Sequence, residues 1–184
     1  MWKTLPNFLT ALRIIMIPVL VIIFYLPWAG AHITAGLIFM AASATDWLDG
    51  FLARHLKQTT RLGAFLDPVA DKLIVATALV LVVSVPYLQY VVLPAIIIIS
   101  REIIISALRE WMAEVGRRAS VSVVTIAKWK TAIQMVAVSC LILYEPQYPT
   151  IIVIVGYITL YIATLLTLWS MLLYLYAARR AFEE

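Results

Sequence analysis

The sequence predicts an all-α integral membrane protein with six transmembrane helices. Of its 184 residues, 64% are hydrophobic and 13% are charged, and the mean hydropathy is +1.00. Soluble domains carry roughly 25% charged residues, so this composition argues against a soluble enzyme, a disordered chain and a secreted disulfide scaffold. The single cysteine, Cys140, cannot form an internal disulfide, and neither His32 nor His55 belongs to a zinc-type cluster.

Long apolar stretches define the expected helices, because a transmembrane helix needs about 20 mostly apolar residues. Three stretches contain no Asp, Glu, Lys or Arg: residues 14–45, 73–100 and 146–178. The first two are interrupted by turns that contain Pro27 and Pro86. A fourth stretch, 120–144, is apolar apart from Lys128 and Lys130. The expected helices therefore span residues 5–26, 32–55, 62–84, 89–112, 121–144 and 149–177.

The first residues have a pattern of their own. One helical face carries Trp2, Leu5, Leu9 and Leu12, and another carries Lys3, Asn7 and Thr10. We expect a short N-terminal interfacial helix over residues 2–13 that leads into the first span. The alternative of a cleaved signal peptide ending near residues 29–31 is weakened by the deep position of Arg13 and by the odd number of spans that cleavage would leave.

The basic residues indicate how the helices cross the membrane. All 14 Lys and Arg residues lie in the terminal segments or in and beside the second and fourth connections, and the other connections contain none. By the positive-inside rule, both termini and the even-numbered connections are cytoplasmic. We expect a multi-pass protein of the inner (cytoplasmic) membrane, with residues 1–184 as a single domain. The net charge of +4 and the pI near 9.3 suit anionic membrane lipids and not nucleic acid.

Four carboxylates lie where a membrane segment should avoid charge. Asp46 and Asp49 are three residues apart in the second expected helix, and Asp67 and Asp71 are four apart in the third, so each pair shares a helical face. The connection between these helices is short, so the two faces can meet near the cytoplasmic interface. One interpretation is interfacial ion pairing with nearby cations: Arg54, Arg61 and Lys72. Four converging carboxylates repel one another unless divalent cations neutralise them. Ligands that are all oxygen atoms favour Mg²⁺ or Mn²⁺, and four carboxylates can hold two such ions.

The spacing of these residues resembles that of a known family. The sequence resembles the signature of the CDP-alcohol phosphotransferase family at every fixed position of the pattern Asp46-x2-Asp49-Gly50-x2-Ala53-Arg54-x8-Gly63-x3-Asp67-x3-Asp71. Three further segments, residues 6–13, 101–111 and 128–131, resemble members that act on glycerol 3-phosphate. The resemblance covers essentially the whole chain. It implies six helices around a polar cavity that faces the cytoplasm, usually in a homodimer.

The resemblance also implies a reaction and a set of roles. The expected activity displaces CMP from CDP-diacylglycerol with sn-glycerol 3-phosphate as the acceptor, giving phosphatidylglycerol phosphate. Asp46, Asp49 and Asp67 are expected to bind metal. Asp71 is expected to serve as the general base and as a further metal ligand. The residues expected to bind CDP-diacylglycerol are Asp49, Gly50, Ala53, Arg54, Thr60 and Gly63.

A second group of residues is expected to bind the acceptor. The phosphate of glycerol 3-phosphate is dianionic, so its pocket needs clustered cations. The candidates are embedded near the expected spans: Arg13, Arg101, Arg109 and Lys130. Glu102 and Glu110 are expected to orient these arginines.

Other functions stay open at this point. Another acceptor, such as inositol phosphate, would need only a different pocket within the same family. An intramembrane prenyltransferase would fit the spacing of Asp67 and Asp71 but not the pattern from Asp46 to Arg54. A divalent-cation transporter could use the same carboxylates, but transporters place such sites at the bilayer midplane between inverted repeats.

Overall fold

The computed structural model describes residues 5–56, 61–115 and 124–183, with side chains outside the description at 5–7, 46–56, 61, 62, 64, 124–128, 177 and 180–183. The described residues contain helices and turns but no strand. The helices are α1 (Leu5–Phe24), α2 (Ala31–Leu56), α3 (Arg61–Val83), the 3-10 helix η1 (Gln89–Val91), α4 (Val92–Glu114), α5 (Val124–Leu143) and α6 (Thr150–Glu183). Each α-helix overlaps one of the six expected ranges, and α6 continues six residues beyond its expected end.

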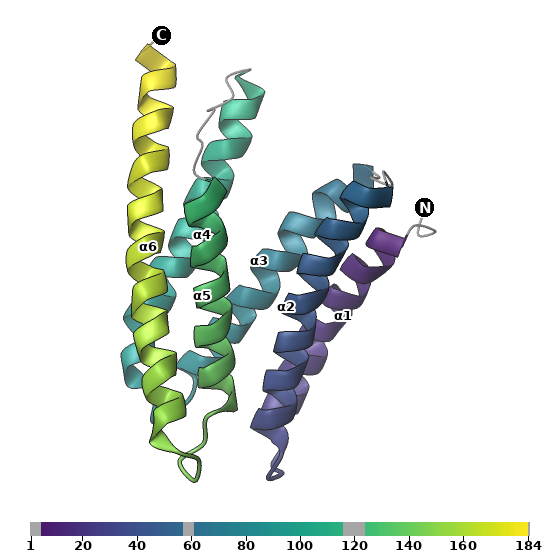
Figure 1. Cartoon of the computed structure of the whole chain (residues 1–184), viewed down its shortest axis with the longest axis vertical. Coiled ribbons are helices and arrows are strands. Elements are labelled where there is room, and N and C mark those ends of the chain that lie inside the picture. Colours follow the sequence, from purple (N-terminus) through teal and green to yellow (C-terminus); the bar gives the residue numbers. More distant parts are fainter. Residues whose placement is uncertain (1–4, 57–60, 116–123, 184) are drawn as a thin grey trace.

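Proline-containing turns separate the helices at one end of the bundle (Figure 1). Pro27 follows the end of α1, Pro86 follows the end of α3, and Pro146 follows the end of α5. Proline lacks a backbone N–H and disfavours helical backbone in the residue before it, so it ends helices at such places. The turns expected from the sequence are therefore confirmed.

The expectation of a separate N-terminal interfacial helix over residues 2–13 is wrong for the part that the structure describes. From Leu5 onward, α1 continues without a break to Phe24. No glycine or proline lies between Pro6 and Pro18 to end the helix. Thr10 and Arg13, on the polar side of this segment, are buried in the protein at 1% and 0% exposure.

One apolar core joins all six long helices. Each helix contributes at least one side chain with almost no exposure: Leu20, Phe39, Leu79, Ile98, Leu141 and Leu160. The helices α2 and α5 approach closely at Gly36, where a Cβ atom would lie 2.6 Å from Cδ2 of Leu143. A side chain at position 36 would therefore force the Leu143 side chain to move.

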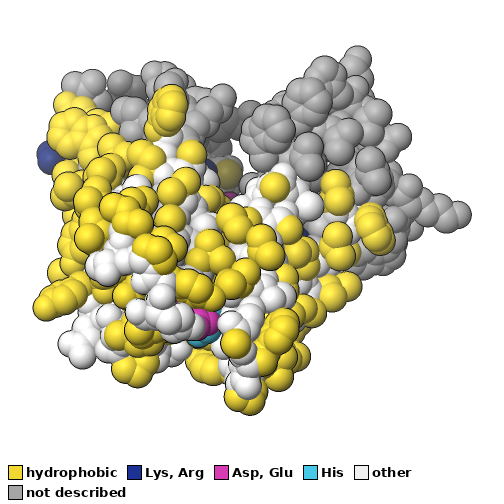
Figure 2. Space-filling model, turned by 60° about the horizontal axis from the view of Figure 1, so that its bottom comes forward, with side chains coloured by type: hydrophobic (Ala, Val, Ile, Leu, Met, Phe, Trp, Pro, Cys, Tyr) yellow, Lys and Arg dark blue, Asp and Glu magenta, His cyan; other side chains and the backbone are white. Residues whose placement is uncertain are grey.

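The outer surface of the bundle is strongly apolar, as Figure 2 shows for one face. Large aliphatic side chains are widely exposed, for example Leu93 at 64% and Leu165 at 67%. Two helical segments in the described part of the chain, Gln89–Glu114 and Thr150–Tyr176, are long and apolar enough to cross a bilayer. Shorter apolar helices cover Phe8–Phe24, Ala31–Thr45 and Trp129–Leu143. Soluble proteins rarely expose apolar surface on this scale, so the chain is a membrane protein.

The helix directions place the start of α1 and the end of α6 at one end of the bundle. In Figure 1 the start of α1 and the end of α6 lie at the same end, opposite the proline turns. Helix α1 packs on α2 and α3, α6 packs on α4 and α5, and α5 joins the two groups through its contacts with α2 and α3. These contacts place α3 beside both α4 and α5.

Candidate active site

Helix α3 supplies two carboxylates of the predicted site. Asp67 and Asp71 lie one helical turn apart, and both are half-buried. The Oγ1 hydroxyl of Thr10, on α1, donates a hydrogen bond to Oδ1 of Asp67. This contact holds one carboxylate oxygen in place, while ionised carboxylates keep further lone pairs that can bind a cation.

A small cavity beside Asp71 connects three helices. Its volume is about 50 Å³, which is large enough to hold ordered water. Its lining consists of Asp71, Lys72 and Val75 from α3, Glu102 from α4, and Lys130, Thr131, Gln134 and Met135 from α5. The cavity therefore brings the expected general base, Asp71, to the same place as Lys130, which the sequence predicts to bind the acceptor.

Glu102 sits at the centre of a group of buried charges. Its Oε1 atom accepts hydrogen bonds from Nη1 of Arg101 at 2.9 Å and from Nζ of Lys130 at 2.5 Å. Arg101 and Lys130 are only 6% and 4% exposed. Two cations and one carboxylate leave a net positive charge in a place shielded from water, where charge–charge attraction is strong. The expectation that Glu102 orients an arginine agrees with these contacts, which also include the lysine.

Arg109 lies further along α4 and contacts α6. Its Nη2 donates a hydrogen bond to the hydroxyl of Tyr174 at 2.6 Å, and its Cζ lies 4.8 Å from the centre of the Tyr174 ring. Arg101 approaches the same ring, at 5.9 Å. The structure therefore brings Arg101 and Lys130 together through Glu102, and Arg101 and Arg109 together through Tyr174.

Arg13 is the fourth cation predicted to bind the acceptor. It lies on α1, three residues after Thr10, and its side chain is completely buried. Of the four predicted acceptor cations, Lys130 lines the cavity beside Asp71, whereas Arg13, Arg101 and Arg109 are not among its described lining residues. Arg13 lies on the same face of α1 as Thr10, which binds Asp67. This places Arg13 on the Asp67 side of the site.

Part of the predicted site lies outside the described side chains. The backbone of α2 is helical through Asp46, Asp49, Gly50, Ala53 and Arg54, which keeps the first four on one helical face. Thr60 lies outside the described residues, and Gly63 is buried in the first turn of α3. Among the residues that the structure describes, no three His, Cys, Asp or Glu residues converge on a metal position. The four-aspartate metal site therefore stays a prediction.

Sequence reasoning missed several hydroxyl groups that contact the charged residues. They are Thr10 against Asp67, Ser106 against Lys72, and Ser170 and Tyr174 against the arginines of α4. Nζ of Lys72 donates a hydrogen bond to Ser106 Oγ at 2.5 Å. The interpretation of the aspartates as interfacial ion pairs predicts an aspartate as the partner of this lysine. The available signal was spacing: Thr10 is one turn from Arg13, and Ser170 is one turn from Tyr174.

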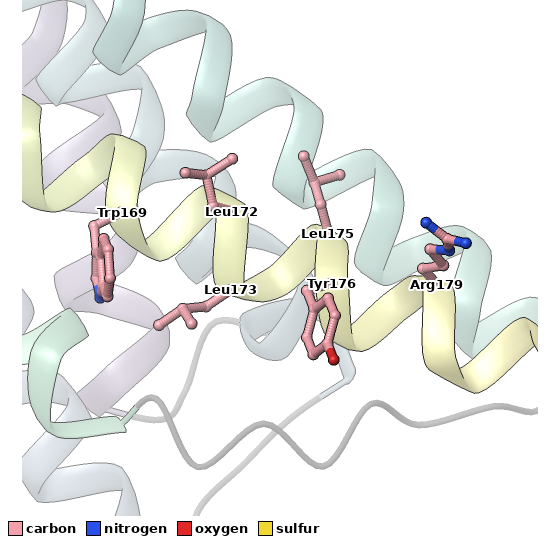
Figure 3. Close-up of a pocket in the computed structure, with 6 residues that line it drawn as sticks. All are labelled: Trp169, Leu172, Leu173, Leu175, Tyr176 and Arg179. Carbon is pink, nitrogen blue, oxygen red and sulfur yellow. The ribbon is translucent and has the colours of Figure 1, made fainter.

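A larger groove on α6 has a different character (Figure 3). Its volume is about 470 Å³, and its lining residues are Trp169, Leu172, Leu173, Leu175, Tyr176 and Arg179. The described lining is mainly apolar and contains no carboxylate. Such a groove on the outside of a membrane protein suits lipid chains, so the smaller cavity beside Asp71 is the candidate active site.

Known proteins match this chain over most or all of its length. The family described as CDP-alcohol phosphatidyltransferase matches residues 3–173. A protein of Sodalis glossinidius is 55% identical over 184 residues, which is 100% of both chains. A protein of Haemophilus influenzae is 54% identical over 95% of this chain and 93% of its own, and one of Pectobacterium atrosepticum is 55% identical over 98% and 97%. All three are named CDP-diacylglycerol–glycerol-3-phosphate 3-phosphatidyltransferase. The chain belongs to the CDP-alcohol phosphatidyltransferase family.

Proposed function

We propose that this chain is an enzyme of phospholipid biosynthesis that transfers the phosphatidyl group of CDP-diacylglycerol to sn-glycerol 3-phosphate, giving phosphatidylglycerol phosphate and CMP. The observation that carries the proposal is the similarity to relatives named for this activity, which reaches 55% identity over the full length of both chains. The buried cations Arg101 and Lys130 add a local feature that suits an acceptor bearing a phosphate.

Two divalent cations, Mg²⁺ or Mn²⁺, would be held by Asp46, Asp49, Asp67 and Asp71. The donor set suits hard cations, because it offers only carboxylate oxygens from two pairs at helical spacing. The hydrogen bond from Thr10 to Asp67 would help to keep one of these ligands in place. When bound, such ions neutralise the charge of the pyrophosphate and of the CMP leaving group.

The side chains around the cavity suit the proton transfer that the reaction needs. Asp71 accepts the proton of the acceptor hydroxyl, whose oxygen then attacks the β-phosphorus of CDP-diacylglycerol. The bond from this phosphorus to the CMP oxygen breaks, and CMP leaves with the electron pair. Lys130 lies at the same cavity as Asp71 and attracts the acceptor phosphate, which brings the hydroxyl toward the base.

The remaining contacts divide between the two substrates. The CDP-diacylglycerol side is formed by Asp49, Gly50, Ala53, Arg54, Thr60 and Gly63, where the small residues leave room for the nucleotide and Arg54 binds a phosphate. The acceptor side is formed by Arg13, Arg101, Arg109 and Lys130. The acyl chains of the donor stay among the membrane lipids.

We also propose how the chain sits in the membrane. The six long helices all cross the inner membrane, and residues 1–184 form one domain with both termini on the cytoplasmic side. The start of α1 and the end of α6 lie at one end of the bundle, which supports this topology (Figure 1). The basic residues support it too, because they are concentrated near the two termini and in and beside the second and fourth connections. The cavity opens to the cytoplasm, and the enzyme works as a homodimer.

One assay tests the proposed activity. The purified full-length protein is incubated with Mg²⁺ and labelled CDP-diacylglycerol, and glycerol 3-phosphate, inositol phosphate, inositol and serine are offered in turn. We expect CMP release and a lipid product only with glycerol 3-phosphate. Equal or faster turnover with another acceptor would contradict the proposal.

A further inference from the structure

Helix α6 carries a stripe of hydroxyl groups within an apolar segment. Thr164, Thr167, Ser170 and Tyr174 follow one another at spacings of three or four residues, so they lie along one side of the helix. The first three are buried, at 5%, 0% and 0% exposure. A buried polar group is costly unless it is hydrogen-bonded. The Thr167 hydroxyl has no hydrogen-bond partner among the described residues, whereas those of Ser170 and Tyr174 contact the arginines of α4.

The hydroxyl of Ser170 binds Arg101 in a defined orientation. Its Oγ donates to the backbone oxygen of Thr167 at 2.9 Å, and it accepts a hydrogen bond from Nη2 of Arg101 at 3.0 Å. The other terminal nitrogen of Arg101, Nη1, donates to Glu102. Since one contact comes from α6 and the other from α4, the guanidinium group is held from two sides.

The Tyr174 side chain links this guanidinium group to a second one. Its ring centre is 5.9 Å from Cζ of Arg101 and 4.8 Å from Cζ of Arg109, within the range of cation–π attraction. Its hydroxyl accepts a hydrogen bond from Arg109 at 2.6 Å. Two like charges are therefore kept close to each other by an aromatic ring.

We infer that Ser170 and Tyr174 are positioning residues that hold Arg101 and Arg109 for the phosphate of the acceptor. The Nε atom of Arg101 is buried and has no hydrogen-bond partner among the residues that the structure describes. A donor held in this way is suited to an anion that enters from outside the protein. The inference rests on the proposed function, and it adds α6 to the helices whose side chains bind the acceptor or position the residues that bind it.

The variants Ser170→Ala and Tyr174→Phe test this inference. Each variant removes one oxygen atom that accepts a hydrogen bond from an arginine, and the arginine itself stays in place. A typical hydrogen bond contributes enough to change an affinity by about 2- to 10-fold, and we expect the KM for glycerol 3-phosphate to rise by that factor. The KM for CDP-diacylglycerol should stay at the wild-type value, and Ser170→Thr, which retains an Oγ atom, should restore the acceptor KM.

Thr164→Val is the matched control. Thr164 is buried on the same helix, but its hydroxyl donates to the Leu160 backbone oxygen within α6, so both KM values should stay unchanged. If Ser170→Ala and Tyr174→Phe raise both KM values together, or change neither, the positioning role is wrong. Wild-type turnover with glycerol 3-phosphate is measured in the same series, so that a failure of the proposed function is seen separately from a failure of this inference.

Discussion

Replacing Lys130 by methionine would remove one buried positive charge while keeping an unbranched side chain of similar length. Nζ of Lys130 lies 2.5 Å from Oε1 of Glu102, and the residue is only 4% exposed, so bulk water and salt screen its charge weakly. A hydrogen bond to a charged group contributes about 1.5–3 kcal/mol. If Lys130 binds the acceptor phosphate, its loss should raise the KM for glycerol 3-phosphate by about 10- to 150-fold.

Steady-state CMP release, with each substrate varied in turn, measures this effect. The KM for CDP-diacylglycerol should change little, because the proposed donor site lies on the α2 and α3 side. Lys130→Met leaves Glu102 paired with Arg101 at 2.9 Å, so the two remaining charges neutralise each other. The melting temperature is measured alongside, so that a loss of folding is seen separately from a loss of acceptor binding. An equal rise in both KM values, or no rise in either, would refute the reasoning.

Three further outcomes can be checked separately. Asp71→Asn should abolish CMP release while binding of CDP-diacylglycerol, followed by titration calorimetry, largely persists, because the substitution removes the base; normal turnover would contradict this role. Treatment with excess chelator should stop the reaction, and Mg²⁺ or Mn²⁺ should restore it, whereas full turnover in chelator would exclude the proposed metal site. Gly36→Ala should lower the free energy of unfolding by about 1–3 kcal/mol because its Cβ would collide with Leu143. Gly30→Ala, whose Cβ meets only the Trp28 ring at 3.4 Å, should melt like the wild type, and equal melting of the two glycine variants would show that the close approach is not needed.

The long helices could be predicted from the sequence because membrane spans depend on composition. Long apolar stretches and the prolines that interrupt them locate the six long helices of the described chain. The pairing of Asp67 and Asp71 on one face of α3 could also be predicted, since it depends only on helical periodicity. Both kinds of information are local in the chain.

The contacts between helices could not be predicted in the same way. A helix such as α6 is apolar on nearly every side, so hydrophobicity does not indicate which side turns inward. The role of Ser170 depends on Arg101, which lies 69 positions away in the chain. In α1 the polar residues Thr10 and Arg13 face the protein while Phe8 and Ile15 are exposed, the reverse of a helix in water. The surrounding lipid decides this orientation.

The arrangement of charges around Glu102 has a consequence for the order in which the chain enters the membrane. Arg101 and Glu102 are neighbours on α4 and neutralise each other there, at 2.9 Å. This helix therefore carries its own counter-charge when it leaves the ribosome and partitions into lipid. Lys130 on α5 binds the Glu102 carboxylate of α4 and shares a cavity with Asp71 of α3, so its counter-charges lie on helices made before α5. Because synthesis proceeds from the N-terminus, the Arg101–Glu102 pair of α4 is made before the lysine of α5 that joins it.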